Sequence, residues 1–218
     1  MAREQKRNDI ITPCPEEVQR YLDKWKGRDN KHYVIQEDAL DDLFLKTYPQ
    51  NTDIKQVIIK VSALNDFYST NIFKVYDVAD NIVNLKIDNR IASKDFTLVK
   101  DIANVRVSKQ TDESEEKIIN FYSFATKYCS RHNPIEYPIY DYYVDRILRY
   151  FRNTDEKIDF KNEELKDYTK YRDIIFEFRK QYGLEQFNLK KIDRYLWQLG
   201  KEKFPKNYGI KTIDKHNE

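Results

Sequence analysis

Hydrophobic residues recur at helical spacing along most of this chain. In the segment 53–68, the apolar positions Ile54, Val57, Ile58, Val61 and Leu64 follow one another every three or four residues. A period of 3.6 residues brings such positions onto one face of an α-helix. Alternation with a period of two, the sign of a half-buried strand, is weak throughout. The pattern therefore predicts an all-α protein.

The pattern divides into about nine helices, whose ends are marked by proline, glycine and capping residues. Pro15 suits the first turn of the first helix, and Asp112 followed by Glu115 resembles a capping box at the start of the sixth. Gly183 and Gly200 are placed to end the last two. The helices are predicted at about residues 12–27, 36–47, 53–68, 72–87, 96–105, 112–132, 139–151, 163–182 and 189–199.

A polar segment, Ser108–Ser114, interrupts this pattern and is predicted to link two helical lobes. A chain of 218 residues is long enough for one domain, or for two small lobes that share a cleft. We expect an N-terminal tail at residues 1–14 and a first lobe at 15–107. The second lobe, with the candidate site, is expected at 108–205, followed by a C-terminal tail at 206–218.

Charge adds a local signal rather than a global one. Charged residues make up 35% of the chain, yet the formal net charge is only +2. The segment Phe187–Lys211 is basic, with seven basic residues against two acidic ones. Within it, Lys190, Lys191 and Arg194 are predicted to contact nucleic-acid phosphates. The alternative is a solvated helix face with no nucleic-acid partner.

Cysteine content and hydropathy set further bounds. Cys14 and Cys129 cannot form a disulfide framework, which favours a reducing cytoplasm. Cys129 and His132 have a C-x2-H spacing without a second pair of ligands, so neither a metal site nor another cofactor is predicted. The polar N-terminus has no apolar leader region, and no run of about 18 apolar residues occurs, so no membrane segment is expected. Nothing in the sequence predicts the oligomeric state.

The candidate chemistry lies in one segment, Ser123–Asp141. A helical wheel places Lys127 opposite the apolar face of its helix, so that this lysine faces either bulk solvent or the wall of a cleft. Asp141 follows Pro138 and falls in the first turn of the next helix, where a carboxylate caps free N–H groups. Both residues are also compatible with ordinary surface charges on a packed helical domain.

Four segments carry a resemblance to a known family: Lys60–Thr70, Ser123–Tyr128, Pro138–Val144 and Ile192–Trp197. They resemble the helix-hairpin-helix DNA glycosylase superfamily, in particular small bacterial proteins with an 8-oxoguanine-DNA-glycosylase-like fold. The resemblance covers about residues 36–204. The G-x-G hairpin of that superfamily is absent, because no glycine occurs between Gly27 and Gly183.

The resemblance implies a DNA-repair enzyme that acts on a damaged base flipped out of the duplex. Lys127 would be the nucleophile of a glycosylase and lyase, and Asp141 its electrostatic partner. Arg131 would lower the pKa of the lysine and contact substrate, while Tyr140 and Tyr142 would help to receive the base. DNA would be the partner.

A different class of function is compatible with the same residues. The alternative is a noncatalytic helical module that binds nucleic acid or a protein partner, for instance in defence against foreign DNA. Fold alone does not decide between the two. The geometry of Lys127 and Asp141 does: one pocket lined by aromatic residues and shared by both favours the enzyme. Trp197 is expected to be buried with the stripe of Ile192, Leu196 and Leu199 that docks the last helix.

Overall fold

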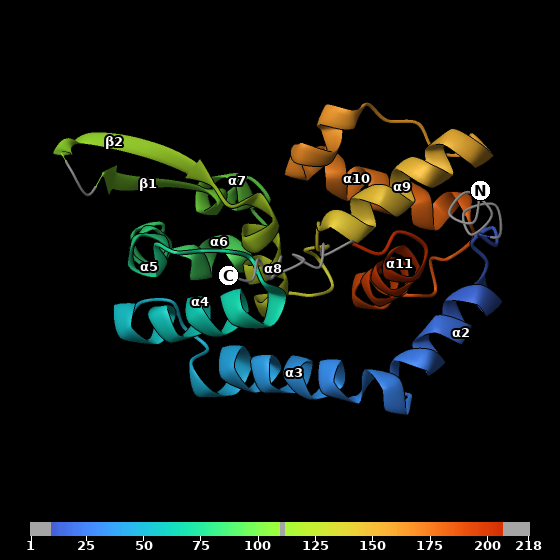
Figure 1. Ribbon diagram of the computed structural model, residues 1–218, viewed down its shortest axis with the longest axis horizontal. Coiled ribbons are helices and arrows are strands. Elements are labelled where there is room, and N and C mark those ends of the chain that lie inside the picture. The colour runs from blue at the N-terminus through green and yellow to red at the C-terminus, as the bar shows by residue number, and fades with distance from the viewer. Residues whose placement is uncertain (1–9, 110–111, 207–218) are drawn as a thin grey trace, which may run out of the picture.

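The computed structural model describes residues 10–109 and 112–206, and this part of the chain is mostly helical, as predicted (Figure 1). Short 3-10 helices at Arg28–Asn30 and Asn162–Lys166 and a π-helical turn at Leu43–Thr47 supplement the main elements. The main elements are α2 (Pro15–Trp25), α3 (Lys31–Asp42), α4 (Ile54–Tyr68), α5 (Val75–Asn84), α6 (Ile87–Ala92), α7 (Leu98–Ala103), β1 (Asn104–Lys109), β2 (Asp112–Asn120), α8 (Tyr122–His132), α9 (Tyr142–Asp155), α10 (Tyr168–Gln181) and α11 (Leu189–Lys203).

The helices form two groups with α8 between them. Helices α4 to α7 and the two-stranded sheet lie on one side, and α2, α9, α10 and α11 lie on the other (Figure 1). Helix α3 runs along the edge of both groups (Figure 1). Because neighbours surround it, α8 is buried over almost its whole circumference rather than along one stripe. Its buried residues are Tyr122, Phe124, Ala125, Thr126, Lys127, Tyr128, Cys129, Ser130 and Arg131.

The first helix of the described chain packs on the last. The rings of Tyr21 in α2 and Tyr195 in α11 meet edge to face with 5.5 Å between their centroids. Gln198 Nε2 in α11 also donates a hydrogen bond of 2.9 Å to the backbone oxygen of Tyr21. The N-terminal helix therefore belongs spatially with the C-terminal helices. The lobe boundary predicted at residue 107 lies within β1.

The hairpin replaces what the helical pattern predicted around residues 104–120. The predicted fifth helix ends at Ala103, and the predicted sixth begins only at Tyr122. Val105 and Val107 are buried whereas Arg106 between them is exposed, which is the period of a strand. β-branched residues also favour extended backbone, and Val105 pairs with Ile119 in the antiparallel register. The capping-box pattern at Asp112 is therefore wrong as a helix start, because it opens β2.

The predicted helix at 72–87 is shorter in the structure, and a further helix that was not predicted follows it. Helix α5 ends at Asn84, and Lys86 has a φ of +50°, a left-handed conformation that a helix interior does not adopt. The chain resumes as α6 in a new direction. Ile82 before the turn and Ile87 after it are both fully buried, so the break lets each helix direct its own apolar face into the core.

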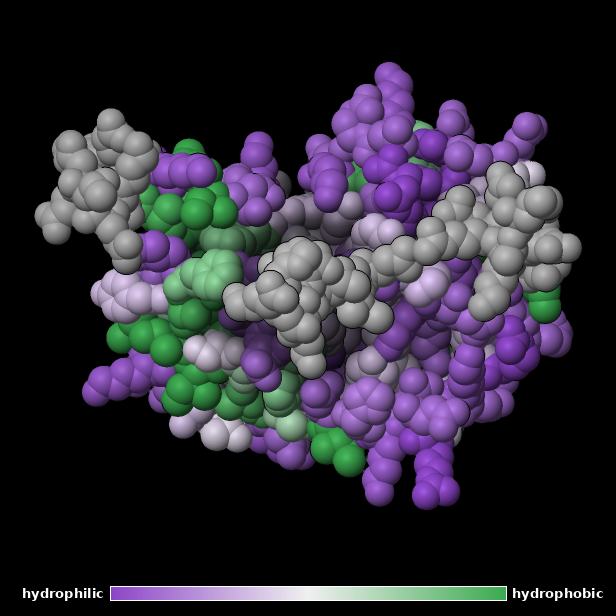
Figure 2. All heavy atoms as spheres, in the orientation of Figure 1, coloured by the Kyte–Doolittle hydropathy of each residue, from purple (hydrophilic) through white to green (hydrophobic). Residues whose placement is uncertain are grey.

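Hydrophobic groups are distributed unevenly over the surface. In Figure 2 they gather over the side of the molecule that carries α4, α5 and the hairpin, while the side with α9 and α11 is mostly hydrophilic. Phe73 is 92% exposed, and Ile118 in β2 is 61% exposed. Within residues 10–109 and 112–206, no helix is both long and apolar enough to cross a bilayer.

Gly200 sets how closely α9 and α11 approach. It lies within α11, which continues to Lys203, so the predicted helix end at Gly200 is wrong. A Cβ at this position would stand 2.6 Å from the backbone oxygen of Tyr143 in α9. Glycine is therefore required by a close approach between two helix backbones rather than by a helix end.

We expect Gly200→Ala to reduce the free energy of unfolding by about 1–3 kcal/mol, because the added methyl group forces α9 and α11 apart. Alanine is otherwise the better helix former by up to about 1 kcal/mol, so the two effects have opposite signs. Urea denaturation measures the outcome, with the exposed Lys191→Ala in the same helix as a control that should stay within about 0.5 kcal/mol. A stabilised Gly200→Ala variant would contradict the close contact.

Candidate functional site

Lys127 and Asp141, the two residues predicted to carry chemistry, line the same pocket. It lies where α3, α4, α8 and α11 meet the start of α9. Its empty space is ≈ 640 Å³ when the open solvent at its mouth is included. The aromatic residues in its wall are Trp25, Tyr33, Phe67, Tyr68 and Trp197, and the polar ones are Gln36, Glu37, Lys127, Arg131, Asp141, Asp193 and Arg194.

Lys127 is buried in the wall of this pocket, with 4% of its surface exposed. Its Nζ donates a hydrogen bond of 2.6 Å to Ser123 Oγ one turn earlier and lies 5.4 Å from the ring centre of Tyr68. Burial lowers the pKa of Lys127 below its ordinary value, and Asp141 and Asp193 act against this shift. The sequence predicted that Lys127 faces either bulk solvent or the wall of a cleft, and in the structure it lies in the wall of the pocket. A lysine in such a site reaches its nucleophilic, neutral form at a lower pH than an exposed one.

Asp141 is the N-cap of α9, as its position after Pro138 predicted. Its Oδ1 accepts hydrogen bonds from the backbone N–H groups of Tyr143 at 2.8 Å and Val144 at 2.9 Å. These bonds fix the carboxyl group at the positive end of the helix dipole. Within the described ranges its second oxygen, Oδ2, accepts no hydrogen bond.

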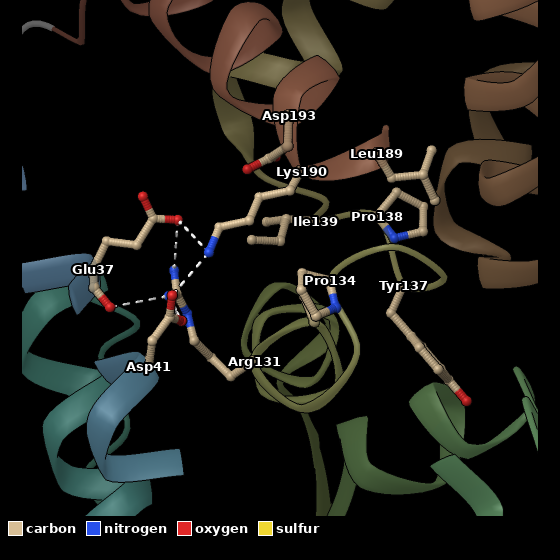
Figure 3. A pocket seen from close by; sticks show the side chains of 11 residues that line it. Glu37, Asp41, Arg131, Pro134, Tyr137, Pro138, Ile139, Leu189, Lys190 and Asp193 are labelled. Atoms are coloured by element: carbon tan, nitrogen blue, oxygen red, sulfur yellow. Dashed lines mark hydrogen bonds and ion pairs between the residues drawn. The ribbon is translucent and has the colours of Figure 1, made fainter. Parts of the chain in front are cut away.

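Asp193 is a second carboxyl group in the pocket that sequence analysis did not single out. Burial, together with the neighbouring charges of Asp141 and Glu37, raises the pKa of Asp193 to about 8. No residue in the described part of the chain forms a hydrogen bond or ion pair with it, and in Figure 3 it stands apart from the linked charges below it. At neutral pH this group is mostly protonated, so it can donate one hydrogen bond and accept others.

The available signal for Asp193 was its spacing from Trp197. Residues four apart share one face of a helix, so an acid four positions before a tryptophan points to the same side of α11. The predicted docking stripe is confirmed, because Ile192, Leu196 and Leu199 are each 1% exposed. Trp197 lies on the adjoining face and is only half-buried. Its predicted burial in the core is therefore wrong.

Three aromatic rings from three segments form one wall of the pocket. Trp197 meets Tyr33 at 5.0 Å and Trp25 at 5.9 Å between ring centres, both nearly perpendicular. Trp25 comes from α2, Tyr33 from α3 and Trp197 from α11, so the wall exists only when the first and last helices are assembled. Such a wall offers flat apolar faces against which a planar ligand can stack.

Arg131 is a structural link rather than a free cation beside Lys127. Its guanidinium donates a hydrogen bond of 2.8 Å to Asp41 Oδ1 and another to the hydroxyl of Tyr68. Glu37 lies within 3.8 Å as well (Figure 3). These contacts join α8 to α3 and α4. A part of the predicted effect remains, since Arg131 contributes to the lowered pKa of Lys127, although less than burial does.

The same two acids neutralise two of the cations predicted to bind nucleic acid. Lys190 Nζ lies 2.9 Å from Asp41 and 3.3 Å from Glu37, as Figure 3 shows. Arg194 Nη2 lies 2.7 Å from Glu37. Lys191, the third cation, is exposed. The structure therefore joins Lys190 and Arg194 in one ion-pair network that is separate from Lys191, and of these two cations only Arg194 lines the pocket.

The structure places the side chains of Tyr140 and Tyr142 outside the pocket. Tyr140 is buried, its hydroxyl donates a hydrogen bond of 2.8 Å to Asp145, and only its backbone oxygen faces Lys127 Nζ, at 3.5 Å. Tyr142 is 37% exposed at the start of α9, where the guanidinium of Arg146 lies over its ring. The tyrosines that do line the pocket are Tyr33 and Tyr68.

A second buried lysine shows what a purely structural one is like in this fold. Lys60 in α4 donates to the backbone oxygens of Tyr48 and Gln50 and, at 2.5 Å, to Asn51 Oδ1. It does not line the pocket of Lys127. Three acceptors satisfy its three protons. Lys127 has one close acceptor, Ser123 Oγ at 2.6 Å, and two distant ones, the backbone oxygens of Ser123 at 3.4 Å and Tyr140 at 3.5 Å. Its longer bonds and its place in the pocket wall make it the lysine better able to meet a ligand.

The fold and site define a mostly helical protein built around α8, with a buried lysine and two carboxyl groups in one aromatic pocket. Residues 17–136, more than half of the chain, match the family HI_0787_N, described as an N-terminal domain, and the chain belongs to this family. This match includes Lys127 and Arg131, whereas Asp141 and Asp193 lie beyond it.

One curated relative is an uncharacterized protein of Haemophilus influenzae, 46% identical over 113 residues. The matched segment is 52% of this chain and 50% of the relative, so the chain spans about half the length of the curated protein it matches. No solved structure matches the chain.

We expect the stability of this protein to depend on the ionisation of Asp193. An unfolded aspartate ionises near pH 3.9, whereas in the folded protein Asp193 does so at about 8. Between these values the folded state holds the extra proton, so stability falls as pH rises. Asp193→Asn imitates the neutral acid. Its stability advantage over the wild type should grow by on the order of 4 kcal/mol between pH 5 and pH 8.5, because about three pH units separate the two pKa values in that window and each is worth about 1.36 kcal/mol.

Urea denaturation at several pH values measures this difference. Asp173→Asn, which changes an exposed carboxyl group on α10, is the matched control and should show no such trend. A difference between Asp193→Asn and the wild type that stays constant with pH would contradict the neutral state of Asp193.

Proposed function

We propose that this protein is a DNA glycosylase and lyase of the helix-hairpin-helix type, acting on a damaged base flipped into the pocket. The observation that carries the proposal is the joint position of Lys127 and Asp141: a buried lysine and a helix-capping aspartate in the wall of one aromatic pocket. Both residues were assigned these roles from the sequence resemblance.

The environment of Lys127 suits a nucleophile. Neutral Nζ would attack C1′ of the flipped nucleotide and form a C–N bond, while the glycosidic bond breaks and its electron pair leaves with the base. Burial favours the neutral amine, and Ser123 Oγ holds Nζ in position at 2.6 Å. The amine then loses a proton and its lone pair forms the C=N bond of the Schiff base, while the C1′–O4′ bond of the sugar ring breaks and O4′ takes up a proton.

Asp141 suits the electrostatic part of this reaction. Positive charge develops on the sugar as the glycosidic bond breaks, and a fixed carboxylate stabilises that charge without reorganising. Oδ1 is held by two backbone N–H groups of α9, which leaves Oδ2 as the oxygen able to face the sugar or to accept the proton of Lys127.

The remaining groups of the pocket suit a base. Trp25, Tyr33 and Trp197 would stack on it, since a flipped base exchanges its neighbours in the helix for aromatic side chains. Asp193, protonated at neutral pH, would hydrogen-bond to the edge of the base and supply the proton that the departing base takes up. The two carboxyl groups thus differ in role because one is bonded to a helix terminus and the other is not.

We expect the wild type to release a base or nick the strand on at least one duplex among those carrying 8-oxoguanine, uracil, an alkylated base or an abasic site. Borohydride should trap a covalent complex with it, because a Schiff base is reducible. Lys127→Met should abolish trapping, since the amine is lost and side-chain volume is kept. Lys191→Met, at an exposed lysine, is the control that should trap as the wild type does.

Asp141→Asn should slow base release by about 100-fold or more and leave the melting temperature nearly unchanged, because asparagine also caps helices well. Single-turnover kinetics and thermal unfolding separate the two effects. A wild type that is inert on every duplex, or variants that match it, would refute the enzyme. The pocket would then belong to a noncatalytic binding module.

A further inference from the structure

We propose that three cations beside the pocket, Arg146, Lys201 and Lys206, hold phosphates of the DNA strand that carries the flipped nucleotide. We call them the basic rim. The inference rests on the proposed function and adds to it a DNA-binding surface that differs from the one predicted at Lys190, Lys191 and Arg194.

Two cations of the basic rim share one exposed tyrosine. The guanidinium carbon of Arg146 lies 5.3 Å from the ring centre of Tyr142, and Lys206 Nζ lies 4.9 Å from the same centre. Lys206 is also 5.6 Å from the ring centre of Tyr143. Arg146 comes from α9 and Lys206 follows α11, so the two helices place both charges on one face of the protein.

The third cation connects this face to the pocket. Lys201 Nζ lies 4.7 Å from the ring centre of Trp197 and 4.2 Å from that of Tyr33, and both rings line the pocket. The ring centre of Trp197 in turn lies 6.2 Å from that of Tyr143, and Lys206 Nζ lies over the Tyr143 ring. A continuous row of cations and rings therefore runs from the start of α9 to the pocket wall.

The basic rim keeps its charge because its cations rest on aromatic rings rather than on acids. Within residues 10–109 and 112–206, none of the three forms an ion pair with a carboxylate. Two acids on the same helices have other partners: Asp145 pairs with Arg149 at 2.8 Å, and Glu202 with Lys24 at 2.8 Å. A ring orients a cation without neutralising it, so the charge stays available to a phosphate.

The lack of carboxylate partners distinguishes the basic rim from the ion-pair network around Glu37. Lys190 and Arg194 already have carboxylates at 2.9 Å and 2.7 Å, and a phosphate would have to displace them. Salt-sensitive affinity comes from cations that exchange counterions for phosphates, which favours the unneutralised set. Burial is the main cause of the lowered pKa of Lys127, and the charge of Lys206 adds to it.

The test compares the triple variant Arg146→Gln, Lys201→Gln, Lys206→Gln with a control of equal charge change, Lys55→Gln, Lys86→Gln, Lys180→Gln, whose three lysines are exposed. The probe is a fluorescent duplex of about 20 base pairs with one 8-oxoguanine, titrated from about 50 to 300 mM salt. The rim variant should bind about tenfold or more weakly at low salt, and its log–log salt slope should fall by about 2–3. The control should change by less than about threefold.

The outcomes separate this inference from the proposed function. If the wild type shows no salt-sensitive DNA binding, both the basic rim and the proposed function are refuted. If the rim variant binds DNA as the wild type does, or if the control variant loses the same affinity, the basic rim is refuted. Neither result contradicts the proposed site at Lys127. If the triple variant is unfolded by circular dichroism, Lys206→Gln alone decides, with an expected loss of about threefold and a slope change of about 1. At saturating DNA, the rim variant should still trap with borohydride.

Discussion

The burial of the Lys127 amine in α8 is the constraint on which the site depends. An ammonium group taken out of water needs partners, and a lysine without them shifts toward its neutral form. Burial lowers the pKa of both buried lysines, for Lys60 in the neighbouring helix to about 8. Lys60 has three oxygen acceptors within 3.1 Å, whereas Lys127 has only Ser123 Oγ that close, its other two acceptors lying at 3.4 and 3.5 Å. The difference lies in the packing. Lys60 is enclosed by its own loop, and Lys127 is enclosed by helices from both sides of the molecule, which leave a pocket in front of it.

Charge pairing decides which cations remain available around that pocket. Glu37 and Asp41 in α3 gather Arg131 from α8 and Lys190 and Arg194 from α11. This network holds α3 against the centre of the molecule, and much of it is only partly exposed, so it is less screened than a surface pair. It also removes those cations from the set that is free to bind an anion. The cations that rest on rings, beyond the reach of these acids, keep their charge.

The two carboxyl groups of the pocket illustrate how position sets chemistry. Asp141 accepts two backbone N–H bonds at a helix start, which hold its Oδ1 in place. Asp193 lies in the second turn of α11, where no donor from the described part of the chain reaches its carboxyl group, and burial raises its pKa to about 8. One residue type thus supplies a fixed anion and a neutral hydrogen-bond donor within one site. Gly200 supports this arrangement, because it sets the approach of the helix that carries Asp193 to the helix that Asp141 caps.

The sequence by itself determined the helical class, most of the helices and the cap at Asp141, and it singled out Lys127 and Asp141, which line one pocket. These follow from local rules: apolar spacing, proline and glycine positions, and the preference of aspartate for a helix start. Local rules did not separate the valine alternation of β1 from a short helix. Tertiary structure alone decided that Lys127 faces a pocket, that Asp193 stands unpaired in it, and that Glu37 neutralises Arg194. Those outcomes depend on which distant segments meet, as when α2 and α11 bring Trp25 to Trp197, and hydrophobic spacing within one helix carries no information about its neighbours.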